Sequence, residues 1–237
     1  MINTKLFCIP YAGASATIFN KWKRMNKDIG IVPIELKGRG SRMREPLYKT
    51  FEEAVDDVYL RIIDQIDAHS EYSLFGHSMG GLIVFELVHR IINENIKMPQ
   101  KIFISGCTCP RERENKQIHL LPKELFFNKI FDLGGTDALV FENDELTDLF
   151  GPILRADYKI TEEYIANNHR KIKSDLFILY GDTDIGSEGK KLINWEKETT
   201  GHCHFQKFEG GHFFILDQEA EVLNYVNSIL VALNSIK

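Results

Sequence analysis

The stretch that decides the fold reads Tyr72-Ser73-Leu74-Phe75-Gly76-His77-Ser78-Met79-Gly80-Gly81. It opens with the apolar run of a buried strand, and the helix-length segment after it is apolar on nearly every side, as in a helix that lies in the interior. Between the two, the residues fit G-x-S-x-G. This pattern sets a serine on a sharp strand-to-helix turn, where the glycines remove side chains that would collide. The stretch predicts Ser78 as a nucleophile.

The motif gains its specificity from its place in the chain. A chance match to G-x-S-x-G arises in about one of ten chains of this length, because about 7% of residues are glycine. A plain glycine-rich turn is the alternative interpretation. The preceding strand and the following buried helix are the context that a nucleophile turn requires, and they favour the catalytic interpretation.

Strand-length apolar runs alternate with helix-length segments along the chain, which is typical of a parallel sheet covered by helices. The predicted strands are Lys5–Ile9, Ile31–Leu36, Tyr72–Gly76, Lys101–Ser105, Asp175–Tyr180 and His204–Phe208. We predict a single α/β domain over residues 1–237, in which helices flank a mostly parallel central sheet.

One stretch, residues 107–173, breaks this alternation. It offers no good strand, only helical segments separated by Gly134-Gly135 and by Pro152, and it is rich in large apolar side chains. An insertion too long to be a simple loop is usually functional. We predict a helical lid here, called the predicted lid below. Packing of the insertion onto the core would also account for most of its apolar residues.

Composition and charge limit the classes of function. Hydrophobic residues make up 43% of the chain, and the net charge is −5 at pH 7. A nucleic-acid partner would require a basic face, so we expect no nucleic acid. No apolar run reaches the roughly eighteen residues of a membrane helix, and the N-terminal apolar stretch is too short for a signal peptide. We expect a cytoplasmic protein that does not bind a membrane.

The cysteines and histidines give no sign of a metal site. Four cysteines are too few and too scattered for a disulfide framework. Cys107-Thr108-Cys109 lacks a second ligand pair at zinc-like spacing, and neighbouring side chains of His202-Cys203-His204 point to opposite faces of an extended segment. We expect no metal.

A serine hydroxyl becomes a good nucleophile only when a base accepts its proton. Among the eight histidines, His212 stands in a loop that follows the last predicted strand and can reach Ser78. The ring of His77 is expected to point elsewhere on the turn, and His89 lies on the buried helix, where we expect a hydrogen-bonded core residue. We predict His212 as the base.

The base needs a carboxylate that fixes its tautomer and stabilises the imidazolium. The strand after the nucleophile helix ends in Ser105-Gly106-Cys107-Thr108, which contains no acid. The next strand ends in Tyr180-Gly181-Asp182-Thr183-Asp184. We predict Asp184 as the acid, with Asp182 as the alternative. The chain order is then Ser, Asp, His, which is the order of the α/β-hydrolase fold.

An oxyanion hole needs two backbone N–H groups aimed at the developing negative charge. Met79, directly after the nucleophile, is predicted to supply one. The loop after the first strand, Pro10-Tyr11-Ala12-Gly13-Ala14, is predicted to supply the other through Ala12. A tight turn without a catalytic role is the alternative interpretation of this small-residue loop.

These motifs together resemble those of the type II thioesterases that accompany nonribosomal peptide and polyketide synthetases. The opening Pro10-Tyr11-Ala12-Gly13 is similar to the P-x-A-G of that family, and Gly76–Gly81 matches G-H-S-M-G-G. The remaining matches are Leu36-Lys37-Gly38-Arg39-Gly40-Ser41-Arg42 with P-G-R-G-x-R, Pro152-Ile153-Leu154-Arg155-Ala156-Asp157 with the lid motif, and Gly210-Gly211-His212-Phe213 with the histidine loop. Lys37 stands where the family usually has Pro, and Ala14 where a further Gly is common.

The resemblance implies hydrolysis of acyl groups from the phosphopantetheine thiol of an acyl or peptidyl carrier protein, without a cofactor. The role in the family is editing, in which stalled or wrong acyl chains are removed, and we expect a monomer. Arg39, Arg42 and Arg44 form a basic loop that we interpret as solvated, with contact to an acidic carrier protein or its phosphate as the alternative.

Two other functions fit the same residues. A small-molecule carboxylesterase or lipase would use the same three side chains, because the triad treats both kinds of carbonyl alike. A binding module that has kept the fold without catalysis is the third hypothesis.

Overall fold

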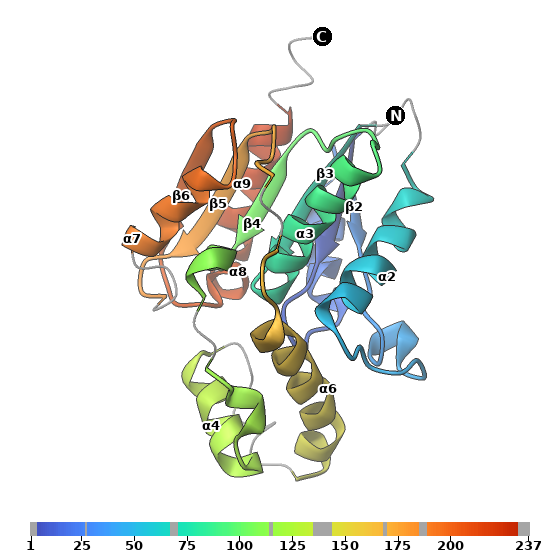
Figure 1. The fold of residues 1–237 in the computed structure, drawn as a ribbon, viewed down its shortest axis with the longest axis vertical. Helices are drawn as coiled ribbons and strands as arrows, with labels where there is room; N and C mark the ends of the chain where they lie inside the picture. The colour runs from blue at the N-terminus through green and yellow to red at the C-terminus, as the bar shows by residue number, and fades with distance from the viewer. Residues whose placement is uncertain are drawn as a thin grey trace.

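The sheet forms the centre of the molecule. The structure, a computed structural model, describes residues 4–26, 28–66, 71–113, 116–134, 144–167, 170–184 and 189–231. Six strands lie in the order β2-β1-β3-β4-β5-β6, and every neighbouring pair is parallel (Figure 1). They are β1 (Thr4–Ile9), β2 (Gly30–Pro33), β3 (Glu71–His77), β4 (Ile102–Ser105), β5 (Leu176–Gly181) and β6 (Cys203–Phe208). All six predicted strands are confirmed, and β2 is shorter than predicted.

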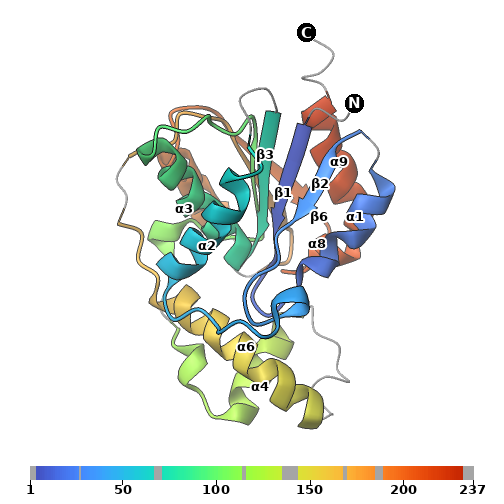
Figure 2. The same ribbon diagram turned by 90° about the vertical axis from the view of Figure 1, so that its right-hand side faces the viewer.

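Helices cover both faces of the sheet (Figure 2). One face carries α2 (Phe51–Ile63) and α3 (Met79–Asn93), together with α7 (Gly189–Leu192) and the 3-10 turn η6 (Ile193–Lys197). The other face carries η1 (Ala16–Phe19), α1 (Asn20–Met25), α8 (Phe214–Asp217) and α9 (Glu219–Val231). This arrangement of a parallel sheet between helices is that of the α/β-hydrolase fold, so the predicted fold class is confirmed.

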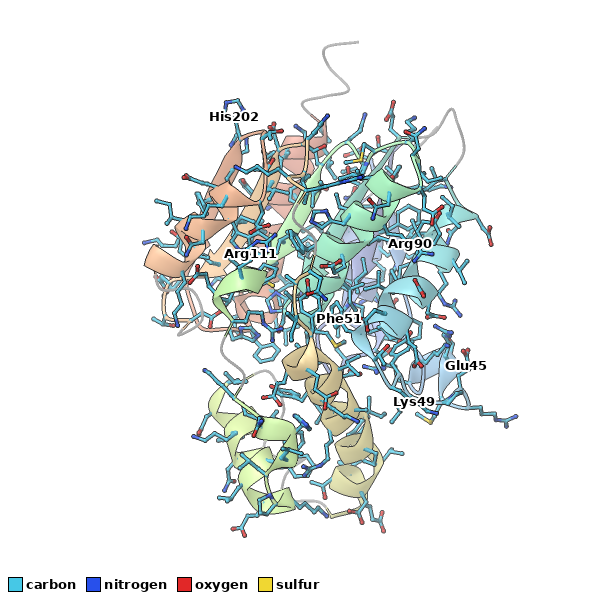
Figure 3. The ribbon with its side chains drawn as sticks, viewed as in Figure 1. Glu45, Lys49, Phe51, Arg90, Arg111 and His202 are labelled. Atoms are coloured by element: carbon cyan, nitrogen blue, oxygen red, sulfur yellow. The ribbon has the colours of Figure 1, made fainter. Side chains whose placement is uncertain are left out.

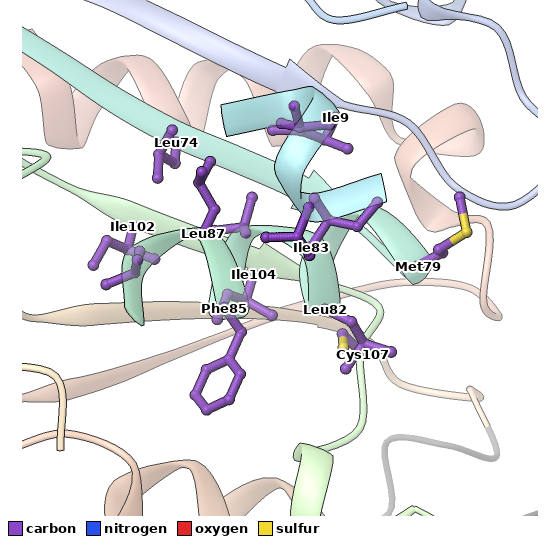
Figure 4. Packing of buried hydrophobic residues seen from close by; sticks show 14 of the residues in the cluster. Ile9, Leu74, Met79, Leu82, Ile83, Phe85, Leu87, Ile102, Ile104 and Cys107 are labelled. Atoms are coloured by element: carbon purple, nitrogen blue, oxygen red, sulfur yellow. The ribbon is translucent and has the colours of Figure 1, made fainter. Parts of the chain in front are cut away.

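The strands supply both cores because successive side chains point to opposite faces. Phe7 and Ile9 of β1 pack under α2 and α3, whereas Leu6 and Cys8 pack under α1 and α9. The helix α3 behaves as predicted, with eleven of its fifteen residues buried. Figure 4 shows its side chains Leu82, Ile83, Phe85 and Leu87 among those of the strands, as expected for a helix in the interior.

The described part of the predicted lid is helical. It contains η3 (Pro110–Glu112), η4 (Ile118–Leu120), α4 (Lys123–Asp132) and α6 (Asp144–Glu163), and α4 and α6 lie together beyond the carboxyl ends of the strands (Figures 1 and 2). Phe126, Phe127 and Ile130 of α4 form a small core with Leu154 of α6, separate from the two large ones. Residues 114–115, 135–143 and 168–169 of the predicted lid lie outside the described residues.

Pro152 does not separate two helices, contrary to the prediction. It lies inside α6, where it removes one backbone donor and crowds the preceding turn at a cost of about 3 kcal/mol. Ile153, Leu154, Asp157 and Ile160 are buried along α6. Their packing gives a physical reason why the helix continues through the proline.

The strand order reverses at one place in the sheet, between β1 and β3. The chain passes from β1 outward to β2 and then returns to β3 on the other side of β1. In open parallel sheets, ligands bind at the carboxyl ends of the strands where the order reverses in this way. The loop after β1 and the turn after β3 meet at that place.

Within the described residues, no helix combines the length and the apolar character that a membrane span requires.

Candidate active site

Ser78 occupies a strained turn between β3 and α3. Its backbone has φ 54° and ψ −116°, a conformation that residues with a side chain rarely adopt. The Ser78 N–H donates to Ser105 O at 2.8 Å, which fixes the turn to β4. A Cβ on Gly76 would lie 2.1 Å from Gly80 O, so the turn can close only with glycine there. Backbone strain that the surrounding contacts hold in place is common at functional sites.

His212 reaches the serine from the loop after β6. Its Nε2 lies 3.0 Å from Ser78 Oγ, and its Nδ1 lies 3.0 Å from Asp184 Oδ2. The side chain of Asp184 is 5% exposed and that of His212 is 18% exposed. A carboxylate can only accept, so Nδ1 carries the proton and donates to Asp184, and Nε2 is left to accept from the serine hydroxyl. The three residues therefore form a relay in the order that proton transfer requires.

Asp182, the alternative acid, has a different contact. Its Oδ1 accepts from the Gly210 N–H at 3.0 Å, and its own N–H donates to Phe208 O at 2.9 Å. A Cβ on Gly181 would lie 2.3 Å from Gly211 O, so the end of β5 and the histidine loop are in close contact. The geometry favours Asp184 as the partner of His212, and it makes Asp182 a residue that shapes the loop.

The loop after β1, called the oxyanion loop (Pro10–Ala14), forms a tight turn. The Ala14 N–H donates to Tyr11 O at 3.1 Å, and Gly13 has φ +80°, which is the signature of a type II turn. Ala14 is not among the residues with positive φ. The alanine at this position, where the family commonly has glycine, therefore fits its backbone.

Both predicted oxyanion donors are available. Among the described residues, no acceptor is recorded for the N–H of Ala12 or for that of Met79. A Cβ on Gly80 would lie 2.3 Å from Ile9 O and 2.7 Å from Pro10 O, so the start of the loop rests directly on the first turn of α3. Figure 4 shows Ile9 and Met79 on these two elements. Their oxyanion role stays a prediction.

The ring of His77 packs beside that of His212. It is buried, its Nδ1 lies 2.9 Å from Ser105 Oγ, and its ring centroid is 5.4 Å from that of His212. Burial lowers the pKa of His77 well below its ordinary value, so the ring is neutral. A neutral ring adds no competing charge beside the base.

The interpretation of the basic loop as solvated is wrong for two of its three arginines. The side chain of Arg39 is 3% exposed and forms a bidentate ion pair with Asp157 of α6, with N–O distances of 2.5 and 2.8 Å. Arg42 is buried in a second pair with Asp57, at 2.6 and 2.8 Å. Arg44 is exposed. Because Arg39 and Arg42 are buried, they also do not fit the alternative interpretation, contact with a carrier protein.

The pairing of Arg39 with Asp157 had no local signal in the sequence, because the partners stand 118 residues apart. Lys37, the other departure from the family pattern, donates its N–H to Tyr48 Oη at 3.1 Å. Proline has no N–H and could not make this hydrogen bond.

His89 differs from the prediction in one respect. It is buried on α3 and packs edge-on against Phe85 at 4.6 Å, but neither ring nitrogen has a hydrogen-bond partner among the described residues. Burial lowers its pKa to about 4. The ring borders a cavity of about 630 Å³ that Phe51 of α2 and Arg90 of α3 also line (Figure 3), and no triad residue lines that cavity.

The fold and the site define a class. A parallel sheet between helices, a serine on a positive-φ turn after a central strand, and an imidazole and a carboxylate in line with it are the features of a serine hydrolase with the α/β-hydrolase fold.

Comparison with known proteins identifies the family. The model of the thioesterase domain matches residues 4–230. The gramicidin S biosynthesis protein GrsT of Aneurinibacillus migulanus is 31% identical over 224 residues, which cover 94% of this chain and 87% of that protein. Thioesterase PikA5 of Streptomyces venezuelae is 28% identical over 228 residues, which cover 96% of this chain and 81% of that protein.

A solved structure extends the comparison to the fold. ClbQ from the colibactin NRPS/PKS pathway superposes with a TM-score of 0.92 and 36% identity, over 99% of this chain and 100% of that one. This chain belongs to the thioesterase family. Its resemblance to the type II thioesterases is confirmed.

Proposed function

We propose that the chain hydrolyses acyl thioesters from the phosphopantetheine arm of a carrier protein, as an editing thioesterase of nonribosomal peptide or polyketide biosynthesis. The observation that carries the proposal is the line of hydrogen bonds from Ser78 through His212 to Asp184, at 3.0 Å each. The family model and the similarity to thioesterases of such pathways support the substrate class.

The proposed reaction has two halves. Ser78 Oγ attacks the thioester carbonyl carbon while His212 Nε2 accepts the hydroxyl proton. When the tetrahedral intermediate collapses, the C–S bond breaks and His212 returns the proton to the sulfur, so the carrier leaves as a free thiol. Water then attacks the acyl-enzyme, with His212 as base again, and the carboxylic acid leaves as Ser78 recovers its proton.

In this proposal, the N–H groups of Met79 and Ala12 stabilise the negative charge on the carbonyl oxygen in both halves. A hole of this kind acts because its dipoles are fixed before the reaction. The contact of Gly80 with Ile9 O and Pro10 O supports the pairing, because it holds the two donors on touching elements.

The predicted lid has a matching role in the proposal. It would cover the acyl chain and the pantetheine arm. Exposed apolar side chains on α4 and α6, among them Leu125, Phe131 and Leu149, are consistent with such contacts.

We also propose that the protein acts as a monomer in the cytoplasm. All proposed catalytic groups come from one chain, and all four cysteines are free, as expected in a reducing compartment.

The experiment that tests this function loads an acyl carrier protein with an acetyl-phosphopantetheine arm and follows loss of the acetyl group by intact-protein mass spectrometry. We expect rapid release by the native chain, and release lowered by about 10⁶-fold in Ser78→Ala with the fold unchanged. Absence of turnover together with rapid cleavage of simple oxygen esters would favour a carboxylesterase or lipase. Failure of Ser78 to react with a fluorophosphonate probe would favour a binding module.

A further inference from the structure

One carboxylate joins three motifs that lie far apart in the sequence. Asp157 Oδ2 accepts from the Gly13 N–H of the oxyanion loop at 2.7 Å and from Arg39 Nη1 at 2.5 Å, and Oδ1 accepts from Arg39 Nη2 at 2.8 Å. The side chains of Asp157 and Arg39 are 2% and 3% exposed. This is a water-excluded contact between the predicted lid, the β1 loop and the β2 loop.

A second contact of the same helix presses on the same loop. Leu154 lies one turn before Asp157 on α6, hence on the same side of the helix. A Cβ on Gly13 would lie 2.4 Å from Leu154 Cδ2 and 2.9 Å from Leu154 Cγ. The loop is therefore held through a hydrogen bond to its Gly13 N–H and through close packing at the Gly13 Cα.

The restrained residue is next to the proposed donor. Ala12 and Gly13 are the two central residues of the turn that Tyr11 and Ala14 close. The Ala12 carbonyl and the Gly13 N–H belong to the same rigid peptide plane. An acceptor that fixes the Gly13 N–H therefore limits the rotation of that plane about the Ala12 backbone. The first turn of α3 contacts the start of the loop through Gly80, and α6 contacts the loop at Gly13.

We infer that Asp157 is a positioning residue of the oxyanion loop, with Arg39 holding its carboxylate in place. The inference rests on the proposed function, because it assigns a purpose to the geometry of Ala12. It implies that α6 is part of the catalytic framework. The rest of the predicted lid is free to move only to the extent that this contact allows.

The hydrogen bond from Gly13 also explains why Asp157 is paired with the cationic side chain of Arg39. A buried aspartate can accept from the Gly13 N–H only if its charge is compensated, because an unpaired buried carboxylate is strongly unfavourable. Arg39 supplies that charge with a bidentate geometry that leaves Oδ2 able to accept once more.

The test separates positioning from stability. The double variant Arg39→Met/Asp157→Leu removes the acceptor of Gly13 without leaving a buried charge, a kind of replacement that often preserves stability. We expect kcat on a small thioester, S-acetyl-N-acetylcysteamine, to fall by about 10–100-fold with KM changed by less than about threefold. Asp157→Asn should lose less, because its amide oxygen can still accept from Gly13.

The value of kcat is calculated per active site, and the active sites are counted by end-point labelling with a fluorophosphonate. Unfolded molecules are not labelled and therefore do not lower the calculated kcat. Asp57→Asn serves as the matched control. It weakens the other buried arginine pair, that of Arg42, which makes no direct contact with the oxyanion loop. We expect it to lower the melting temperature and leave kcat per labelled site unchanged.

Inhibition by a trifluoromethyl ketone reports on the oxyanion hole directly, because its adduct with Ser78 places an oxyanion in the hole. A loss of protein stability alone would not change its Ki. Its Ki should rise in the double variant in proportion to the fall in kcat/KM. A double variant with native kcat per site and native Ki would overturn the inference. A native chain that is inactive on the thioester would instead contradict the proposed function itself.

Discussion

Asp184 and Asp182 lie two residues apart, yet the structure gives them different tasks. Asp184 faces His212 Nδ1, and Asp182 faces the Gly210 N–H. At the scale of single residues this is the sharpest test of the site, because both are aspartates on the same loop and both can be replaced by an amide of the same shape.

We expect Asp184→Asn to lower kcat by about 10⁴-fold, because the amide no longer stabilises the correct tautomer of the base. Asp182→Asn should change kcat by less than about tenfold, since the amide oxygen can still accept from Gly210. Steady-state hydrolysis of an acyl thioester measures both. The opposite ranking of the two variants would show that the acid has been assigned wrongly.

His89 provides a prediction about pH and stability. Burial places its pKa at about 4 in the folded chain, below the ordinary histidine value of 6.5. As pH falls below 6.5, the unfolded chain takes up a proton that the folded chain refuses until about pH 4. Stability is therefore fully present above pH 6.5 and declines toward pH 4, by about 2 kcal/mol between pH 7 and pH 5 from this residue.

Urea denaturation at pH 7 and pH 5 measures this difference. In His89→Leu, which cannot titrate, we expect the pH-dependent loss to be smaller than in the native chain by that amount. Val88→Ala, at a buried neighbour on α3 that carries no titratable group, is the matched control and should leave the pH-dependent loss unchanged. An equal loss in native and His89→Leu proteins would contradict the assignment.

Among the elements, α3 and β1 are the pair whose contact governs the site. A Cβ on Gly80 would meet backbone oxygens of β1 and its loop, whereas a Cβ on Gly81 would lie 3.0 Å from Cys107 Cβ and 3.2 Å from Ile104 Cγ2, which are side-chain atoms. Backbone cannot move aside as a side chain can. The two adjacent glycines should therefore respond differently to the same added methyl group.

We expect Gly80→Ala to destabilise the protein by about 1–3 kcal/mol and to lower kcat by about 100-fold, because it pushes the oxyanion loop away from Met79. Gly81→Ala should destabilise to a similar or smaller extent with kcat within about threefold of native, since its contacts lie away from the loop. Thermal melts and kcat per labelled site check both. Equal losses of kcat would argue against the role of the Gly80 contact.

Most elements could be predicted from the sequence because their signals are local. The nucleophile turn, the six strands and the buried helix each follow from residues within one short window, and the histidine loop follows from its place after the last strand. What the sequence did not reveal depends on distant partners. The sequence shows the charge of Arg39 but not its partner Asp157 on α6, so the prediction of a solvated side chain is wrong. The prediction of a break at Pro152 is wrong because the local pattern does not show the packing along α6.

At the scale of the whole molecule, the buried apolar side chains of the described residues form three clusters. Two large cores lie on the faces of the sheet, and the cluster of Phe126, Phe127, Ile130 and Leu154 lies in the predicted lid. Regions with few buried apolar contacts open more easily than the central core. Helix α4 should therefore open independently of the sheet, whereas α6 is held by Asp157 and by Ile160 in a large core.

We expect Phe126→Ala to remove about 3–5 kcal/mol of packing and to speed amide hydrogen exchange in α4, while β1, β3 and β4 exchange as in the native chain. Phe85→Ala, which truncates a fully buried ring of α3, is the control and should speed exchange across the sheet. Exchange followed by mass spectrometry resolves the two patterns. Uniform acceleration in Phe126→Ala would show that the predicted lid and the sheet unfold as one unit.

The pairing of β1 with β3 sets a limit on how such a protein can change during evolution. Ile9 stands opposite Gly76 in the ladder, the oxyanion loop begins one residue after Ile9, and Ser78 stands two residues after Gly76. Loss or gain of a single residue within β1 would exchange its two buried faces and shift the loop away from Ser78 at once. Variation in chain length among descendants should therefore accumulate elsewhere, while the distance from the first strand to its loop stays constant.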